Sequence, residues 1–217
     1  MTKSKIFLFL IPLFLYSCAS GSIYSELVNN LKILISGPDD IAAKKINSIP
    51  YASLQVSLGR GNNILMILEE DLNGTLKWTS SNLIKMYTKN GFIVKFKGLD
   101  NELDQIEFDK DHPIYQDNFE IKKDSFTSFY TFNNPKLFRL PVKTKINLIG
   151  TEKVEVLGTI YQTKLFEEVT LTNLISWKFR NFYWIDESGF MIKSQQSFTP
   201  KNPAMNILVT KKYKKPG

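Results

Sequence analysis

The residue with the clearest chemical assignment in this sequence is its single cysteine, Cys18. It ends the stretch 15–18, in which an apolar residue, a variable position and a small residue precede the thiol, as in a lipobox. Two lysines and an apolar run over residues 6–16 come before it, which is the plan of a bacterial export signal. That run is shorter than the roughly 20 residues that span a bilayer. We predict a signal peptide over residues 1–17 and a diacylglyceryl group on the Cys18 thiol. The alternative is an uncleaved signal anchor with an incidental thiol.

Lipidation of Cys18 would attach the mature chain, residues 18–217, to a membrane. The new amino terminus is a second acylation site, for instance for palmitate. Several acyl chains anchor stably where one binds reversibly, because each buried methylene adds about 0.8 kcal/mol. Ala19 follows the cysteine, where an Asp would be the usual signal for retention in the inner membrane. We therefore expect a cell-envelope protein attached to the outer membrane and facing the periplasm.

The residues 109–112, Asp-Lys-Asp-His, are the best candidates for catalysis or cation binding. His112 is the only histidine of the chain, so a Ser-His-Asp triad would have to use it. Asp109 and Asp111 would add two carboxylates. The interpretation favoured here is a polar loop before Pro113. The residue counts exclude a zinc site of the usual Cys and His ligands, and no Gly-rich phosphate-binding motif is present. We predict no enzyme activity, no metal and no cofactor.

Acidic pairs are the other residues that could cleave a glycosidic bond. Residues 69–71 and 186–187 approach turns, where acids gather for solvation and local hydrogen bonds. Glu167 and Glu168 lie within a strand pattern, so their side chains would point to opposite faces. None of these pairs predicts a catalytic dyad.

Aromatic residues crowd one predicted strand, residues 177–185, and offer ring faces for stacking on sugars. We keep Trp177, Tyr183 and Trp184 as candidates for contact with a glycan or a partner. Because aromatic residues occupy both faces of this strand, some must point away from the domain interior or into a second contact. A core position under a covering helix is favoured over a glycan platform, and Trp78 is also predicted to be core.

The chain carries a formal net charge of +7, and part of it lies in the tail over residues 211–215. A basic tail can attract anionic lipid or acidic glycan, although a solvated chain end is the simpler interpretation. The chain has no stretch of interleaved basic and aromatic residues of the kind that binds nucleic acid, so we predict no nucleic-acid partner.

The elements that must position these residues are mainly strands. Apolar residues at near-helical spacing predict an amphipathic helix over residues 23–34, and a short second helix is predicted over residues 41–46. The pattern then alternates, and Asn-Gly pairs at residues 73–74 and 90–91 predict tight hairpins. Strands are predicted over residues 53–58, 64–70, 75–80, 83–87, 92–97, 125–132, 138–140, 144–149, 152–157, 159–172, 177–185, 190–198 and 205–210.

Residues 100–124 have the least regular pattern and predict a helical turn or a mobile flap. About a dozen strands at this spacing predict a single mainly β domain, either an antiparallel barrel or a strongly curved sheet, since sheet edges need closing or covering. The helix over residues 23–34 is the expected cover. Glycines at positions 150 and 158 are expected to break strands.

The ordered set of residues from 49 onward resembles the YjbF family of lipoproteins. The resemblance is carried by Ile49-Pro50-Tyr51-Ala52-Ser53, Leu58, Trp78, residues 80–82, Gly91, residues 98–99, the ending Phe182-Tyr183-Trp184-Ile185-Asp186, Gly189, Ser194, Gln196 and Pro200. It implies a mainly β, outer-membrane lipoprotein linked to production or export of capsule or exopolysaccharide. Polysaccharide and envelope export proteins would then be its partners. It implies no known reaction, and only Cys18 transfers, as the lipid attachment point.

These observations predict a non-enzymatic lipoprotein that binds or scaffolds a component of a surface-polysaccharide pathway. One alternative is a carrier of lipid or lipoprotein with an apolar cavity. The other is a glycan-modifying enzyme that uses Asp109, Asp111 or the acids near turns.

Overall fold

The structure is a computed structural model that describes residues 43–116, 118–123 and 125–214. The predicted signal peptide, Cys18 and the predicted helix over residues 23–34 lie outside the described residues. The described chain begins with a short helix, α2 (Ala43–Asn47), close to the one predicted over residues 41–46. Its Ile46 is completely buried.

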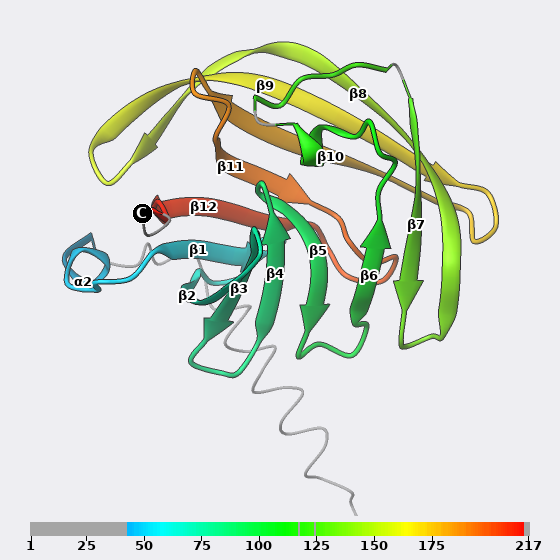
Figure 1. Cartoon of the computed structure of the whole chain (residues 1–217). Coiled ribbons are helices and arrows are strands. Elements are labelled where there is room, and N and C mark those ends of the chain that lie inside the picture. The colour runs from blue at the N-terminus through cyan, green and yellow to red at the C-terminus, as the bar shows by residue number, and fades with distance from the viewer. Residues whose placement is uncertain (1–42, 117, 124, 215–217) are drawn as a thin grey trace, which may run out of the picture.

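In the part of the chain that the structure describes, twelve antiparallel strands form a closed barrel (Figure 1). Each strand pairs with its neighbours in sequence, and β12 pairs with β1 to close the ring. Closure gives every strand a partner on both sides over part of its length. The second half of β8, after Thr144, is paired among the described strands with β9 alone. The predicted mainly β, barrel-like class is confirmed. The strands are β1 (Ser53–Leu58), β2 (Ile64–Leu72), β3 (Thr75–Ser80), β4 (Lys85–Lys89), β5 (Phe92–Lys97), β6 (Leu103–Glu107), β7 (Phe126–Phe132), β8 (Leu137–Val156), β9 (Thr159–Thr172), β10 (Trp177–Asp186), β11 (Met191–Gln196) and β12 (Met205–Lys211).

The two Asn-Gly hairpins form as predicted. Asn73 and Gly74 have φ values of 53° and 86°, and Asn90 and Gly91 have values of 47° and 85°. Positive φ at both central residues is the geometry of a type I′ turn, which matches the twist of the flanking strands. These turns connect β2 to β3 and β4 to β5.

One expectation about strands was wrong, and one strand was not predicted. The three strands predicted between residues 138 and 157 are one strand, β8, because Gly150 lies at a bulge in its ladder with β9 and does not end the pairing. The irregular stretch 100–124 contains a 3-10 turn at Pro113–Tyr115, in agreement with the predicted helical turn, and the short strand β6, which was not predicted. β6 has a weak pattern, because only Leu103 and Ile106 among its five residues are buried.

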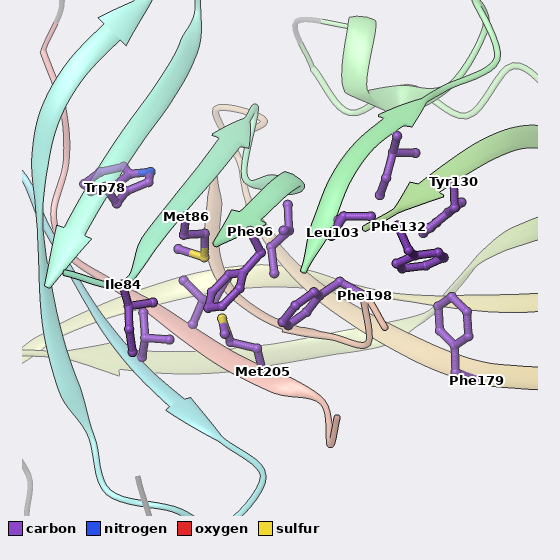
Figure 2. Packing of buried hydrophobic residues seen from close by; sticks show 14 of the residues in the cluster. Trp78, Ile84, Met86, Phe96, Leu103, Tyr130, Phe132, Phe179, Phe198 and Met205 are labelled. Carbon is purple, nitrogen blue, oxygen red and sulfur yellow. The ribbon is translucent and has the colours of Figure 1, made fainter. Parts of the chain in front are cut away.

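Most apolar side chains of the inner face form one large cluster between the two walls of the barrel. Figure 2 shows members from the segment β3 to β7 on one side of the interior. They face Phe179 of β10, Met205 of β12, and Phe198, which lies between β11 and β12. Trp78 belongs to this cluster and is 3% exposed, so the prediction that it is core is confirmed. A second cluster forms where the segment between β6 and β7 packs against β8 to β11. Its buried members are Phe92, Ile114, Phe119, Phe126, Ile146, Phe166, Tyr183, Ile185 and Met191.

One side chain connects strands on opposite sides of the ring. The Gln196 amide on β11 accepts a hydrogen bond from the Ile93 backbone N–H at 2.9 Å and donates one to the Gly91 carbonyl at 2.8 Å. It therefore pairs with the start of β5 much as a neighbouring strand would. The close approach also requires a glycine, since a Cβ at position 91 would lie 2.6 Å from the Met191 Sδ atom.

The far half of the β8–β9 hairpin packs against the outer face of β10 to β12. Val154 and Val156 of β8 cover Trp184 of β10 and Ile192 of β11, and all four are buried. The Trp184 Nε1–H group donates a hydrogen bond of 2.7 Å to the Glu152 carboxylate. The cover of this outer aromatic residue is thus a strand hairpin.

The contact between Gly91 and Met191 predicts a stability difference between two glycines of the same turn type. Gly74→Ala meets no atom within 4 Å, so it should cost only the strain of positive φ, about 1 kcal/mol of unfolding free energy. Gly91→Ala adds overpacking against Met191 and should cost about 3 kcal/mol. Urea denaturation of both variants measures the difference. Equal losses would show that the Gly91 contact does not constrain the barrel.

Candidate functional site

One end of the barrel holds a cavity of about 440 Å³. The strand register brings three hairpin turns to this end, at residues 73–74, 90–91 and 187–189, together with Tyr213 of the C-terminal segment. We call this cavity the barrel mouth. Its volume lies within the range of about 300–1,000 Å³ that small-molecule sites occupy. The residues that line it are Leu54, Asp71, Gly74, Leu76, Trp78, Thr88, Asn90, Gly91, Pro113, Gln116, Phe119, Ser188–Ser194, Ile207, Val209 and Tyr213.

The inner wall of the barrel mouth is mainly apolar. Leu54, Leu76, Ile207 and Val209 contribute aliphatic surface from β1, β3 and β12. The indole of Trp78 is held in place, since its Nε1–H donates a hydrogen bond of 2.8 Å to Thr88 Oγ1 on the next strand. A ligand that entered the barrel mouth would therefore meet a fixed apolar surface.

The rim of the barrel mouth is polar and ordered by its own hydrogen bonds. The Tyr213 hydroxyl donates to Asp71 at 3.2 Å, and the Asn90 amide donates to the Ile114 carbonyl at 3.0 Å. Asp186 accepts hydrogen bonds from the backbone N–H groups of Ser188 and Phe190 and forms an ion pair of 2.8 Å with Lys212. These contacts preform the opening, and a ligand with one apolar part and one polar part fits this arrangement.

His112 lies inside the fold and does not reach the barrel mouth. It is 1% exposed and packs among the rings of Phe92, Phe108 and Phe126, with centroid distances of 5.0, 4.6 and 5.1 Å. Its Nδ1 atom accepts a hydrogen bond of 3.1 Å from the Ile114 backbone N–H and so begins the 3-10 turn. Burial lowers the pKa of His112 to about 3, so the ring is neutral. The sequence favoured a polar loop before Pro113, and the structure instead buries His112 among aromatic rings at the start of the turn.

Asp109 and Asp111 both form ion pairs with Lys123, the first at 3.6 Å. A hydrogen bond from the Asp111 backbone N–H, 3.0 Å long, lowers the pKa of Asp109. The two carboxylates thus neutralise a lysine. Among the described residues no group of three or more Cys, His, Asp or Glu side chains is arranged to hold a metal ion.

The remaining acidic candidates also have structural partners. Glu69 and Glu70 pair with Lys77 across the β2–β3 hairpin. Glu167 and Glu168 point to opposite faces of β9, as predicted: Glu167 pairs with Arg180 on the outer face at 3.2 Å, and Glu168 is buried inside. Asp186 stabilises the β10–β11 turn.

The interior holds a network of three hydrogen-bonded polar side chains that was not predicted from the sequence. The Glu168 carboxylate accepts hydrogen bonds from the Tyr183 hydroxyl and from the Asn181 amide, the latter 2.7 Å long. Burial raises the pKa of Glu168, and burial together with the charge of Glu168 raises the pKa of Tyr183. Alternation along β9 and β10 would have indicated that these three polar residues share the inner face.

The three aromatic candidates for glycan contact are buried in different places. Trp177 packs against Phe179 in the large inner cluster, with ring centroids 4.2 Å apart, and Tyr183 lies in the second inner cluster. Trp184 faces outward beneath the β8–β9 hairpin, with the Lys193 ammonium 4.3 Å above its ring. All three are at most 9% exposed, so little ring face is open for stacking. The prediction that aromatic residues of this strand occupy both faces is confirmed.

The barrel mouth itself was not predicted from the sequence, although an apolar cavity was one of the alternatives. The Asn-Gly turns that border it were recognised as turns. What the sequence did not show is that turns from β2–β3, β4–β5 and β10–β11 meet at one opening, because this depends on the closure of the ring.

Comparison with known proteins places this fold in a family. Residues 28–209 match the family model described as group 4 capsule polysaccharide lipoprotein gfcB, YjbF. The chain belongs to the YjbF family. The resemblance found in the sequence is therefore confirmed.

Two Escherichia coli K12 lipoproteins are relatives of this YjbF family member. It is 25% identical to the uncharacterized lipoprotein YjbF over 193 residues, 87% of this chain and 89% of the relative. It is 20% identical to the uncharacterized lipoprotein GfcB over 195 residues, 88% and 90% of the two chains. The crystal structure of the hypothetical lipoprotein YmcC from the same organism has the same fold, with a TM-score of 0.71 and 18% identity over 88% of this chain and 95% of that one. These relatives carry the names of lipoproteins and no enzymatic names.

The relatives associate this YjbF family member with the cell envelope, since lipoproteins are envelope components. In the described part of the chain, no helix combines the length and the apolar character needed to cross a membrane.

The buried carboxyl of Glu168 predicts a loss of stability as the pH rises. Its pKa in the fold lies above the ordinary value of 4.5, so above pH 4.5 the unfolded chain ionises first. The unfolding free energy should then fall with a slope of up to about 1.4 kcal/mol per pH unit until the pKa in the fold is passed. Glu168→Gln should remove this fall, whereas Glu167→Gln on the outer face should keep it. Urea denaturation at a series of pH values measures both, and identical profiles would contradict the assignment.

Because His112 is neutral in the fold, we expect the unfolding free energy to fall as the pH is lowered, which is opposite to the effect of Glu168. As the pH falls from 6.5 toward 3, the unfolded chain binds a proton that the folded chain excludes. Stability should decrease by up to about 1.4 kcal/mol per pH unit in this window. His112→Leu should flatten that limb, even if the lost hydrogen bond to Ile114 lowers stability at every pH. An unchanged acidic slope would mean that His112 takes up its proton in the fold.

Proposed function

We propose that this chain is a lipoprotein anchored through acyl chains on Cys18, and that it has a non-enzymatic binding role in capsule or exopolysaccharide production or export. The family description and the relative GfcB support the pathway. The lipobox-like stretch 15–18 supports the anchor, and Ala19 supports the periplasmic face of the outer membrane.

The single observation that carries a binding role is the barrel mouth. A closed barrel whose interior was completely filled would offer only its outer surface to partners. Here the large inner cluster stops short of one end and leaves about 440 Å³ between an apolar wall and an ordered polar rim. The proposed ligand is a small molecule or a chain segment of the pathway that places an apolar part against Leu76 and Val209 and a polar part at the rim.

The anchored end of the chain joins the barrel on the same side as the barrel mouth. The segment after α2 enters β1 at Ser53, which pairs with Lys211 at the end of β12. The Lys211 ammonium also donates a hydrogen bond to the Ile49 carbonyl. The tether to Cys18 therefore starts near the opening.

A second candidate function is a carrier of lipid or lipoprotein, and the apolar wall of the barrel mouth favours it. It differs from the first candidate in the pathway, not in the site. A glycan-modifying enzyme has less support, because Asp109 and Asp111 pair with Lys123 and His112 is buried.

A cavity-filling variant tests the proposed function. Deletion of the gene from the source bacterium should lower the amount, the length or the export of surface polysaccharide. Leu76→Trp fills the barrel mouth from β3 and should fail to restore the surface polysaccharide. Leu148→Trp is the matched control, because Leu148 is 55% exposed on β8, and it should restore it.

The outcomes separate the parts of the proposal. Unchanged polysaccharide after deletion would rule out the pathway. Restoration by Leu76→Trp, at normal protein levels, would rule out the barrel mouth as the site. Loss of a lipid or a lipoprotein from the outer membrane, with normal polysaccharide, would favour the carrier.

A further inference from the structure

The outer face of β8, β9 and β10 carries a cluster of cations near the end opposite the barrel mouth. These are the longest strands and arch over the shorter strands β2 to β6 (Figure 1). Lys143 and Lys178 both pair in register with Leu171, and Lys145 and Arg180 both pair with Val169. The four cations thus form two rows across three strands, and we call them the cation belt.

The cation belt is exposed and only partly neutralised. Arg180 forms an ion pair with Glu167 at 3.2 Å, but Lys143, Lys145 and Lys178 have no ion-pair partner among the described residues. From strand geometry, the cations within one row lie about 10 Å apart and the rows about 7 Å apart. Repulsion between such charges costs stability unless an anion compensates it.

Beyond the cation belt, the same end of the barrel exposes large apolar side chains. Leu174 and Ile175 lie in the turn between β9 and β10 and are 71% and 36% exposed. Phe138, at the start of β8, is 78% exposed, and Leu171 is 40% exposed. The rings of Trp177 and Phe132, 6.1 Å apart, hold this turn next to the β7–β8 turn. We call Phe138, Leu174 and Ile175 the apolar tip, whereas Leu171 lies within the belt, between Lys143 and Lys178.

We propose that the apolar tip and the cation belt form a docking surface for an anionic membrane. The two features are layered along β9 and β10: Leu174 and Ile175 come first in the turn, Lys143 and Lys178 follow in one row with Leu171, and Lys145 and Arg180 follow one rung further. On β8, Phe138 precedes Lys143 by five residues. Interfacial proteins bury apolar side chains about 5–10 Å into the boundary between head groups and acyl chains. Insertion of the tip to that depth brings the belt to the level of the lipid phosphates.

This layering favours a membrane over an acidic polysaccharide. A polysaccharide lying along the sheet would use the cations but would leave Phe138 and Leu174 in water. A membrane accounts for both features. The length of the chain after Cys18 permits this docking, because residues 19–42 could span up to roughly 80 Å if extended. The anchor therefore does not force the barrel mouth against the bilayer.

The docking surface can be tested on the acylated, full-length protein in vesicles. With Cys18 acylated, Leu174→Cys supplies one free thiol for a bimane label, and lipids carrying a nitroxide report contact with the bilayer. We expect quenching on vesicles that contain phosphatidylglycerol and loss of quenching on pure phosphatidylcholine. Lys143→Gln and Lys178→Gln should each lower the fraction docked, with an equilibrium constant reduced about fivefold for each lysine.

Ile160→Cys provides the matched control, because Ile160 is 62% exposed at the start of β9, at the end of the barrel that holds the mouth. A label there should not be quenched on either vesicle. Equal quenching at both positions, or none at position 174, would overturn the proposal. Protection of the label at position 174 from aqueous acrylamide by alginate, without any effect of anionic vesicles, would overturn it in favour of an acidic polysaccharide.

Discussion

The hydrogen bonds between Gln196 and the start of β5 constrain the whole interior of this barrel. A ring of twelve strands encloses more space than a single layer of side chains fills, so the walls must approach each other somewhere. Gln196 brings β11 and β5 together, and Gly91 allows the contact because it has no side chain. The barrel mouth borders both inner clusters, since Trp78 of the first and Met191 of the second line it.

Strand alternation made much of the fold predictable, and the last hairpin shows why. In β10, Trp177, Phe179, Asn181, Tyr183 and Ile185 face inward and the intervening residues face outward. The sequence indicated that aromatic residues on both faces need two contacts. It could not indicate that the second contact is the β8–β9 hairpin, because Gly150 resembled a strand end. A glycine at a bulge and a glycine at a turn look the same in a sequence.

The candidate site was less predictable than the fold, since it depends on distant pairs. Cys18 is recognisable from its immediate neighbours alone, whereas the barrel mouth joins residues from Leu54 to Tyr213. Local pattern placed His112 in a polar loop before Pro113 and did not indicate its burial among aromatic rings, because those rings come from distant strands. Local pattern was also not sufficient to bring Glu168, Asn181 and Tyr183 together, although each lies on the inward face that alternation assigns to it.

The barrel thus has a ligand-sized opening at the end where the chain enters and a charged, partly apolar surface at the other. The central claim is that the barrel mouth holds a ligand. Native mass spectrometry of the acylated protein extracted from its own membranes tests this most directly. We expect a non-covalent adduct on the wild-type chain that is absent from Leu76→Trp. A wild-type chain that carries no adduct, or the same adduct in both chains, would contradict this claim.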